Sequence, residues 1–128
     1  QNCVIVSIKK SFPGHAKKIM SSLWGMGQMM FSKFIVVVDE DVNVQNVSEV
    51  MWKFFNNVDP RRDTMIVDGP LEVLDHSAPM PLLGSKMGFD ATRKWKSEGH
   101  PREWPKDIVM SPEIKAMVDK KWSEYGLD

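Results

Sequence analysis

Apolar residues in the first half of the chain alternate between the spacing of strands and the spacing of helices. Apolar runs at 3–8, 34–38 and 64–67 predict three strands, and the unbroken run of the second is typical of a strand covered on both faces. Between these runs, apolar residues recur every three or four positions, which predicts two amphipathic helices. Their apolar faces consist of Ala16, Ile19, Met20, Leu23 and Trp24 in the first helix and of Val47, Val50, Met51, Phe54 and Phe55 in the second. This order predicts an α/β fold in which helices flank a mainly parallel sheet in a layered sandwich.

Capping residues mark where two of the helices begin. Asn46 lies three residues before Glu49, which is the spacing of a capping box, and it predicts the start of the second helix. Near the end of the chain, Ser111 and Pro112 predict the start of a C-terminal helix. The apolar residues that share one face of this helix are Ile114, Met117, Val118, Trp122 and Tyr125.

The stretch between these parts, residues 68–104, is rich in proline and glycine and predicts a long irregular loop. Loops of this length in compact domains usually have a function or are held by a partner. The run Asp75-His76-Ser77 offers side chains that can hydrogen-bond a ligand or order the loop itself. Two tryptophans of the same stretch, Trp95 and Trp104, either line a pocket, pin the loop to the domain or meet another chain.

Size, charge and cysteine content restrict the class of protein. The chain has 128 residues, of which 42% are hydrophobic, and this suits a single domain with one core over 1–128. Its 17 basic side chains are scattered and balanced by 17 acidic ones, which argues against nucleic-acid binding. The lone Cys3 excludes a disulfide scaffold, and neither a membrane-spanning run nor a signal peptide is evident, so we expect a cytoplasmic protein. The start on Gln1 instead of Met indicates a piece of a longer chain.

Two carboxylates one residue apart, Asp39 and Asp41, follow the second predicted strand. They resemble the strand-end Asp-x-Asp-x-Val of haloacid-dehalogenase-like phosphatases, in which the first Asp is the nucleophile, the second is the general acid and a Mg²⁺ ion is shared. Ligands do bind at the ends of parallel strands. Such a phosphatase also needs a downstream Lys and a late acidic pair, and neither is evident here. The alternative, an acidic turn that accepts backbone N–H groups at the end of a buried strand, is therefore the better supported of the two.

Candidate phosphate and metal ligands are few. Lys33 precedes the buried strand, and Lys86 lies in a glycine-flanked segment, 84–88, that predicts a turn whose backbone can approach an anion. Either lysine can neutralise a phosphate, or both are solvated loop residues, because the spacing of a Walker motif is absent. The three histidines are too far apart in sequence for a metal motif, and the Gly-x-Ser-x-Gly elbow of a serine hydrolase is absent.

Five blocks in one order strongly resemble the C-terminal domain of UbiD-family decarboxylases, and together they span almost the whole chain. The blocks are residues 8–17, 33–43, 59–63, 84–95 and 102–104. This resemblance implies reversible, non-oxidative decarboxylation of aromatic or α,β-unsaturated acids on prenylated FMN, with a divalent metal (Mn or Mg) and K⁺ at the flavin phosphate. It also implies a 4-hydroxy-3-polyprenylbenzoate-like substrate, in ubiquinone or menaquinone biosynthesis.

In that family, the Glu-Arg-Glu/Asp catalytic set and the metal ligands lie in an N-terminal domain, which this sequence does not contain. The resemblance therefore implies that this chain has no catalytic residues, binds no cofactor by itself and is inactive alone. It implies two kinds of partner: the N-terminal domain of the same enzyme, and further copies in a homo-oligomer, a dimer or a hexamer. A prenylated substrate would also bring the enzyme to a membrane surface.

The resemblance assigns three roles within this chain. Lys33 would reach the flavin phosphate, and Trp122 and Tyr125 would engage a neighbouring protomer. A loop would cover the substrate with the residues His76, Pro79, Met80, Pro81, Leu82 and Leu83. Closure of such a domain over the flavin would exclude water and fix the substrate carboxylate over the reactive carbon. Two other functions remain as alternatives, a phosphohydrolase that uses Asp39 and Asp41, and a module that serves only oligomerisation.

Overall fold

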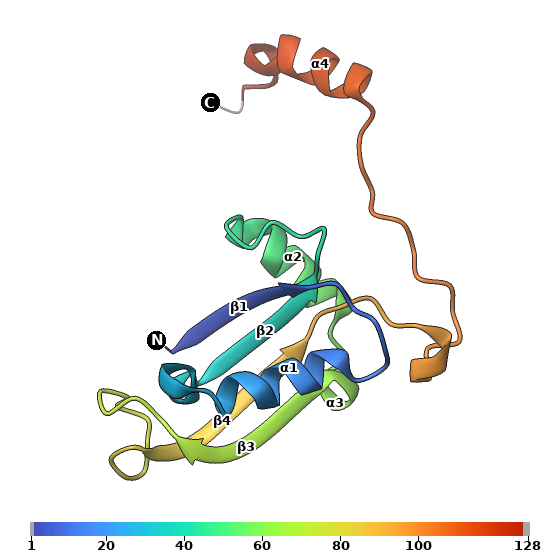
Figure 1. Cartoon of the computed structure of the whole chain (residues 1–128). Coiled ribbons are helices and arrows are strands. Elements are labelled where there is room, and N and C mark those ends of the chain that lie inside the picture. Colours follow the sequence, from blue (N-terminus) through green and yellow to red (C-terminus); the bar gives the residue numbers. More distant parts are fainter. Residues whose placement is uncertain (1, 127–128) are drawn as a thin grey trace.

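A four-stranded sheet forms the centre of the computed structural model, which describes residues 2–126 (Figure 1). The strands are β1 (Cys3–Ile8), β2 (Phe34–Asp39), β3 (Thr64–Pro70) and β4 (Leu83–Asp90). Their order across the sheet is β1-β2-β4-β3. β1, β2 and β4 are parallel, with Val4 opposite Ile35 and Val36 opposite Phe89, whereas β3 is antiparallel to β4 at the edge. The predicted α/β fold with a mainly parallel sheet is confirmed.

Strand β4 lies inside the stretch 68–104, so the prediction of one long irregular loop is wrong. The glycines that suggested a turn instead let side chains from other parts of the chain pack closely against β4. A Cβ at Gly88 would lie 2.5 Å from Sδ of Met20, and a Cβ at Gly84 would lie 2.6 Å from Cδ1 of Leu71. Irregular structure remains between β3 and β4, in residues 71–82, and after β4.

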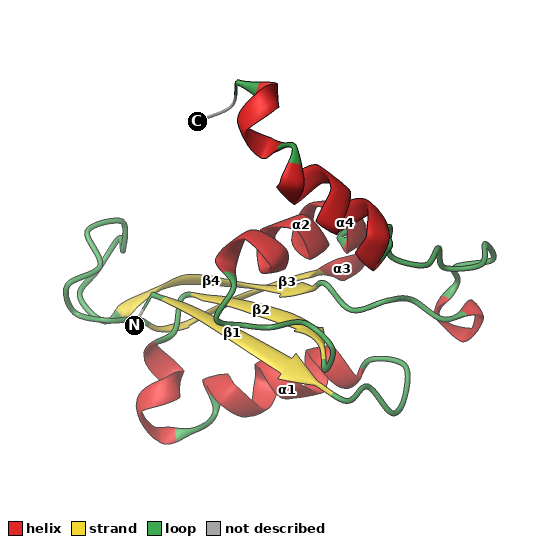
Figure 2. Cartoon of the chain, turned by 90° about the horizontal axis from the view of Figure 1, so that it is seen from above, coloured by secondary structure: helices red, strands yellow, loops and turns green. Residues whose placement is uncertain are grey.

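Helices cover both faces of the sheet (Figure 2). α1 (His15–Trp24) lies on one face and α2 (Val47–Asn57) on the other. β2 contributes to both layers, because Ile35 and Val37 pack on the α1 side while Val38 packs on the α2 side. The buried residues are Ile8, Ala16, Met20, Ile35 and Val37 in the α1 layer and Val38, Val42, Val50 and Ala91 in the α2 layer. The second predicted strand is thus covered on both faces, as expected.

The start of α2 agrees with the prediction, but its buried face differs. Oδ1 of Asn46 accepts the N–H of Glu49 at 3.2 Å, which caps the helix. Three residues of the predicted apolar face are exposed, namely Val47 (61%), Met51 (40%) and Phe55 (72%). Lys53 and Asn57 are buried in their place. Such polar side chains can be buried where they are paired, and Nδ2 of Asn57 donates to the carbonyl of Ala91 at 2.8 Å.

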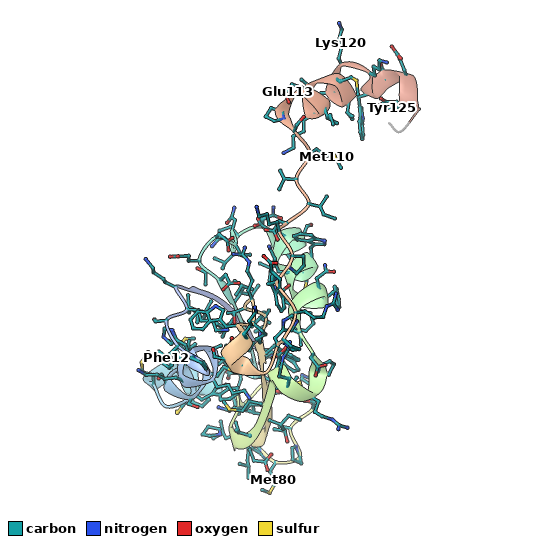
Figure 3. The ribbon with its side chains drawn as sticks, turned by 90° about the vertical axis from the view of Figure 1, so that its right-hand side faces the viewer. Phe12, Met80, Met110, Glu113, Lys120 and Tyr125 are labelled. Atoms are coloured by element: carbon teal, nitrogen blue, oxygen red, sulfur yellow. The ribbon has the colours of Figure 1, made fainter. Side chains whose placement is uncertain are left out.

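The last part of the chain, the C-terminal arm (residues 109–126), extends away from the sheet and its helices (Figures 1 and 3). It contains α4 (Pro112–Lys120), which is capped by the Ser111 hydroxyl, and then a 3-10 helix, η3 (Trp122–Tyr125). The predicted C-terminal helix is confirmed, although its last turn is 3-10. No residue of α4 is buried. None of the helices in the described part of the chain is long and apolar enough to cross a membrane.

Short helices connect the larger elements. They are η1 (Gly27–Phe31), α3 (Pro60–Asp63) and η2 (Lys96–Glu98). α3 begins directly after α2, where the side chain of Asp59 accepts the N–H groups of Arg61 and Arg62, each at 3.0 Å. This cap and the proline at the first helical position start a new short helix between α2 and β3.

Candidate functional site

The amino edge of the sheet, where β1, β2 and β4 begin, brings two predicted site elements together. Lys33 directly precedes β2, and its carbonyl accepts the N–H of Met87 in β4 at 2.9 Å. The segment 71–82, hereafter the loop 71–82, leads into β4 at the same edge. The chain also begins there, since the N–H of Phe34 donates to the carbonyl of Asn2 at 2.8 Å (Figure 1).

Lys33 forms an ion pair with the loop 71–82. Its Nζ lies 3.0 Å from Oδ2 of Asp75 and 3.2 Å from Oδ1, and it also donates to the hydroxyl of Ser77. The N–H and hydroxyl of Ser77 in turn donate to Oδ1 of Asp75 at 2.9 and 2.7 Å. Hydrogen bonds from Ser77 and from Lys33 lower the pKa of Asp75 to about 2. Asp75 is therefore ionised at neutral pH, and the expectation that this run orders its own loop is confirmed for Asp75 and Ser77.

The predicted substrate residues lie at the tip and end of this loop. His76, Pro79 and Pro81 are exposed, and the apolar side chains are also uncovered, with Met80 exposed by 54%, Leu82 by 50% and Leu83 by 41%. Leu83 is the first residue of β4 and not part of the loop. Figure 3 shows Met80 at the outer end of the molecule. The structure thus brings Lys33 and the predicted substrate loop to one edge, with apolar side chains that face solvent.

The carboxyl edge of the sheet, where the parallel strands end, is closed by ion pairs. Asp39 accepts the N–H of Arg93 at 2.8 Å, and the Arg93 guanidinium pairs with Asp41. Burial raises the pKa of Asp39. For Asp41, burial is the largest single influence and acts to raise the pKa, but the hydrogen bond from Arg93, the charge of that guanidinium and smaller contributions together lower it. The two carboxylates therefore hold Arg93 against the strand end, which supports the acidic-turn interpretation over the phosphatase one.

A second set of charges at the carboxyl edge is buried. Nζ of Lys94 lies 3.2 Å from Oδ1 of Asp90 and 3.6 Å from Oδ1 of Asp63. The guanidinium of Arg62 donates to both oxygens of Asp63, at 2.8 and 2.7 Å. The side chains of Lys94, Asp63 and Asp90 are exposed by only 2%, 2% and 5%. The sequence analysis missed this network, although Asp90 and Lys94 are four residues apart and both lie in one of the resembling blocks.

Lys86 does not lie in a turn, and both interpretations of it, a phosphate ligand and a solvated lysine, are wrong. It lies in β4 and is only 2% exposed. Its ammonium donates to the carbonyl of Met30 and lies 5.8 Å from the ring centre of Trp24. Burial lowers the pKa of Lys86. The period of the strand turns every second residue to one face, on which Lys86 lies against η1 and Gly88 lies against α1.

A cavity of about 340 Å³ lies between α2 and the segment that follows η2. Trp104 and Trp52 line it, so the first of the three interpretations of Trp104 applies. The wall also includes Lys53, whose buried Nζ pairs with Asp107 at 2.6 Å. Trp95 is not among the lining residues; Nζ of Lys10 lies 5.0 Å from its ring centre.

The histidines lie in separate places. His15 begins α1, His76 is in the loop 71–82, and His100 lines the cavity beside Trp104. Within residues 2–126, no group of three or more His, Cys, Asp or Glu side chains is placed to hold a metal ion. The two residues predicted to form an interface, Trp122 and Tyr125, lie on the C-terminal arm with their ring centres 6.5 Å apart.

Sequence comparison relates most of the chain to one family. The model of the 3-octaprenyl-4-hydroxybenzoate carboxy-lyase C-terminal domain matches residues 1–91. A protein of Aquifex aeolicus that is described as uncharacterized is 50% identical over 127 residues, which are 99% of this chain and 26% of that protein. The chain therefore spans about a quarter of this relative.

Solved structures of enzymes share the fold. Vanillic acid decarboxylase of Sedimentibacter hydroxybenzoicus in its closed form is 32% identical with a TM-score of 0.76, over 97% of this chain and 26% of that one. The UbiD-class enzyme HmfF of Pelotomaculum thermopropionicum in complex with FMN is 28% identical with a TM-score of 0.74, over 91% of this chain and 25% of that one. With a family match over residues 1–91 and this shared fold, the chain belongs to the UbiD carboxy-lyase C-terminal domain family.

Proposed function

We propose that this chain is the C-terminal domain, 1–128, of a decarboxylase that removes CO₂ from aromatic acids without oxidation, with prenylated FMN as its cofactor. The observation that carries the proposal is the likeness to vanillic acid decarboxylase, which extends over 97% of this chain but only 26% of that enzyme. The groups that carry out the chemistry would then lie in an N-terminal domain, together with the divalent metal and K⁺. We place the contact with such a domain at the amino edge, which carries both Lys33 and the loop 71–82.

Lys33 is the residue of this chain that we assign to the cofactor. It lies at the amino edge with its side chain 19% exposed, and its ammonium suits a phosphate oxygen as a charged hydrogen-bond donor. When bound, the flavin supplies the electron sink for the pair left by the departing CO₂. The part of this chain is to bind the phosphate and to cover the site, since desolvation strengthens electrostatic interactions there.

The loop 71–82 and the start of β4 would cover the substrate. Met80, Leu82 and Leu83 present apolar side chains at the edge that also carries Lys33, and these suit an aromatic ring or a prenyl tail. The description of the matching family names an octaprenyl hydroxybenzoate, so a 4-hydroxy-3-polyprenylbenzoate-like acid and a role in ubiquinone or menaquinone biosynthesis are part of the proposal. We place the enzyme in the cytoplasm, where a polyprenyl tail would bring it to the membrane surface.

The division of labour is tested by assaying CO₂ release from 4-hydroxybenzoate-type acids. The full-length protein that carries this domain should release CO₂ when supplied with prenylated FMN, Mn²⁺ and K⁺, and the 128-residue chain under the same conditions should release none. The full-length protein without prenylated FMN is the control. CO₂ release by the chain alone would overturn the assignment of chemistry to another domain. If the full-length protein released CO₂ from none of a panel of aromatic and α,β-unsaturated acids, the proposal that it is a decarboxylase would be refuted.

We further propose that the C-terminal arm engages a neighbouring protomer through Trp122 and Tyr125. The arm extends from the domain with large apolar residues uncovered, among them Val109 (72%) and Met110 (54%) (Figure 3). Trp122 and Tyr125 are exposed by 47% and 46%. Exposed apolar surface of this extent on a segment without buried residues is typical of an interface.

Replacing Trp122 and Tyr125 together by alanine should dissociate the oligomer of the full-length protein. Aromatic anchors at an interface contribute about 2 kcal/mol or more each, so if the two losses add, the dissociation constant should rise by a factor of roughly 700 or more. Analytical ultracentrifugation over a concentration series measures this constant. The double variant Lys115→Ala and Lys120→Ala, which alters polar residues of α4, is the matched control. Equal dissociation constants for both double variants would show that the two aromatic residues do not anchor the interface.

A further inference from the structure

The ion pair between Lys33 and Asp75 joins the loop 71–82 to the amino edge. Oδ2 of Asp75 is buried, and among the described residues it has no partner except the Lys33 ammonium at 3.0 Å. Oδ1 is held within the loop by both donors of Ser77. The carboxylate therefore belongs to a turn that is closed on itself, and Lys33 is its link to the sheet.

Lys33 also donates to the hydroxyl of Ser77, and further contacts of the loop with the domain lie near its two ends. The N–H of Leu71 donates to the carbonyl of Leu82 at 3.0 Å, and Leu71 is buried. Pro79 packs over Gly84, where a Cβ would come within 3.3 Å of its ring. Leu82 has a φ of +66°, which an L-residue with a branched side chain adopts only when its surroundings hold it. The end of the loop is therefore held in a conformation that it would leave if the loop were released.

We infer that Asp75 and a ligand phosphate compete for Lys33, so that binding of phosphate at Lys33 and anchoring of the loop 71–82 exclude one another. This inference rests on the proposed function, which puts the flavin phosphate at Lys33. Oδ2 of Asp75 lies 3.0 Å from Nζ of Lys33. A phosphate that binds the same nitrogen would lie beside this carboxylate, and the two anions would repel each other. The phosphate carries the larger charge and displaces the carboxylate.

When a phosphate also takes the place of the Ser77 hydroxyl on Lys33, the carboxylate can leave with its turn intact, because its bonds to Ser77 move with it. The loop is then anchored in the empty domain and released when the cofactor binds. Release would free Met80 and Leu82, at the exposed end of the loop, to close over a substrate. The cofactor would thus bind before the loop takes its closed position.

Hydrogen exchange of the loop 71–82 in the full-length protein tests this inference, with FMN as the ligand and riboflavin, which lacks the phosphate, as the ligand control. FMN should speed exchange of the loop amides roughly tenfold, and riboflavin should leave it unchanged. The variant Asp75→Asn should exchange at the faster rate without any ligand and should bind FMN roughly tenfold more tightly than the wild type. Asp68→Asn is the matched control, because Asp68 accepts a hydrogen bond from the hydroxyl of Ser85 at 2.8 Å and, among residues 2–126, forms no ion pair with a lysine.

Three results would overturn the inference. Slower exchange of the loop with FMN, together with weaker FMN binding by Asp75→Asn, would show that Asp75 supports the phosphate site. Unchanged exchange in Asp75→Asn without ligand would show that the ion pair does not anchor the loop, whatever the role of Lys33. A Lys33→Met variant that binds FMN as tightly as the wild type would instead refute the proposed contact of Lys33 with the phosphate, and with it the competition, even if Asp75→Asn loosens the loop.

Discussion

Replacing Lys94 by methionine should lower the free energy of unfolding by about 3–5 kcal/mol, the usual cost of removing one partner from a buried ion pair. The ammonium lies between Asp90 and Asp63, and all three side chains are exposed by 5% or less. Without it, Asp90 would remain buried but lose its ion pair, and the backbone carbonyls of Asp90 and Thr92 would lose donors at 2.9 and 2.5 Å. Urea unfolding followed by tryptophan fluorescence measures the change.

Lys96→Met is the matched control for this variant. Lys96 lies two residues further along the chain, on η2, and its side chain is exposed. Its replacement should change the free energy of unfolding by no more than about 0.5 kcal/mol. If Lys94→Met and Lys96→Met unfold at the same urea concentration, the buried charges do not hold the carboxyl edge together.

The substitution Gly88→Ala should destabilise the domain by about 1–3 kcal/mol through overpacking. A Cβ at this position would lie 2.5 Å from Sδ and 3.0 Å from Cγ of Met20, and 3.2 Å from the ring of Trp24. Met20 is fully buried between α1 and the sheet, so it has no space into which it can withdraw. The same urea unfolding measurement gives the effect.

Gly69→Ala, on the neighbouring strand β3, is the control, since the nearest atom to its Cβ would be Cε of Lys86 at an ordinary 3.6 Å. The double variant Gly88→Ala, Met20→Ala adds a second test, because the smaller side chain at 20 makes room for the new methyl group. Its loss of stability should be smaller than the sum of the two single losses by about 0.5–3 kcal/mol. Additive losses would show that the contact with Met20 is not the cause.

Local features of the fold were predictable because their causes are local. The cap of α2 depends on Asn46 and the residue three positions later, and both are adjacent once the first turn forms. The continuous apolar run of β2 shows its burial on both faces, and the helical spacing of Ala16 and Met20 shows the buried side of α1. The order of resembling blocks also pointed to the family that the comparison then confirmed.

β4 could not be found in the same way, because its residues serve contacts with distant parts of the chain. Gly84 and Gly88 suggest turns, but here each lets a side chain from another element approach the strand. A lysine such as Lys86 suggests a solvent-exposed position, but its long side chain reaches the end of η1, where a backbone carbonyl accepts its hydrogen bond. A strand with glycine and lysine at its buried positions has no apolar pattern to reveal it.

The candidate site shows the same division between local and tertiary causes. The sequence by itself determined the candidate side chains: Lys33 before a buried strand, the run 75–77, and an apolar segment at 80–83. Only the tertiary structure decided that they meet, since the pairing of β2 with β4 brings residues 42 positions apart within 3.0 Å of each other. Ion pairs and close packing depend on distances in space, and local patterns of hydrophobicity and capping carry no information about those distances.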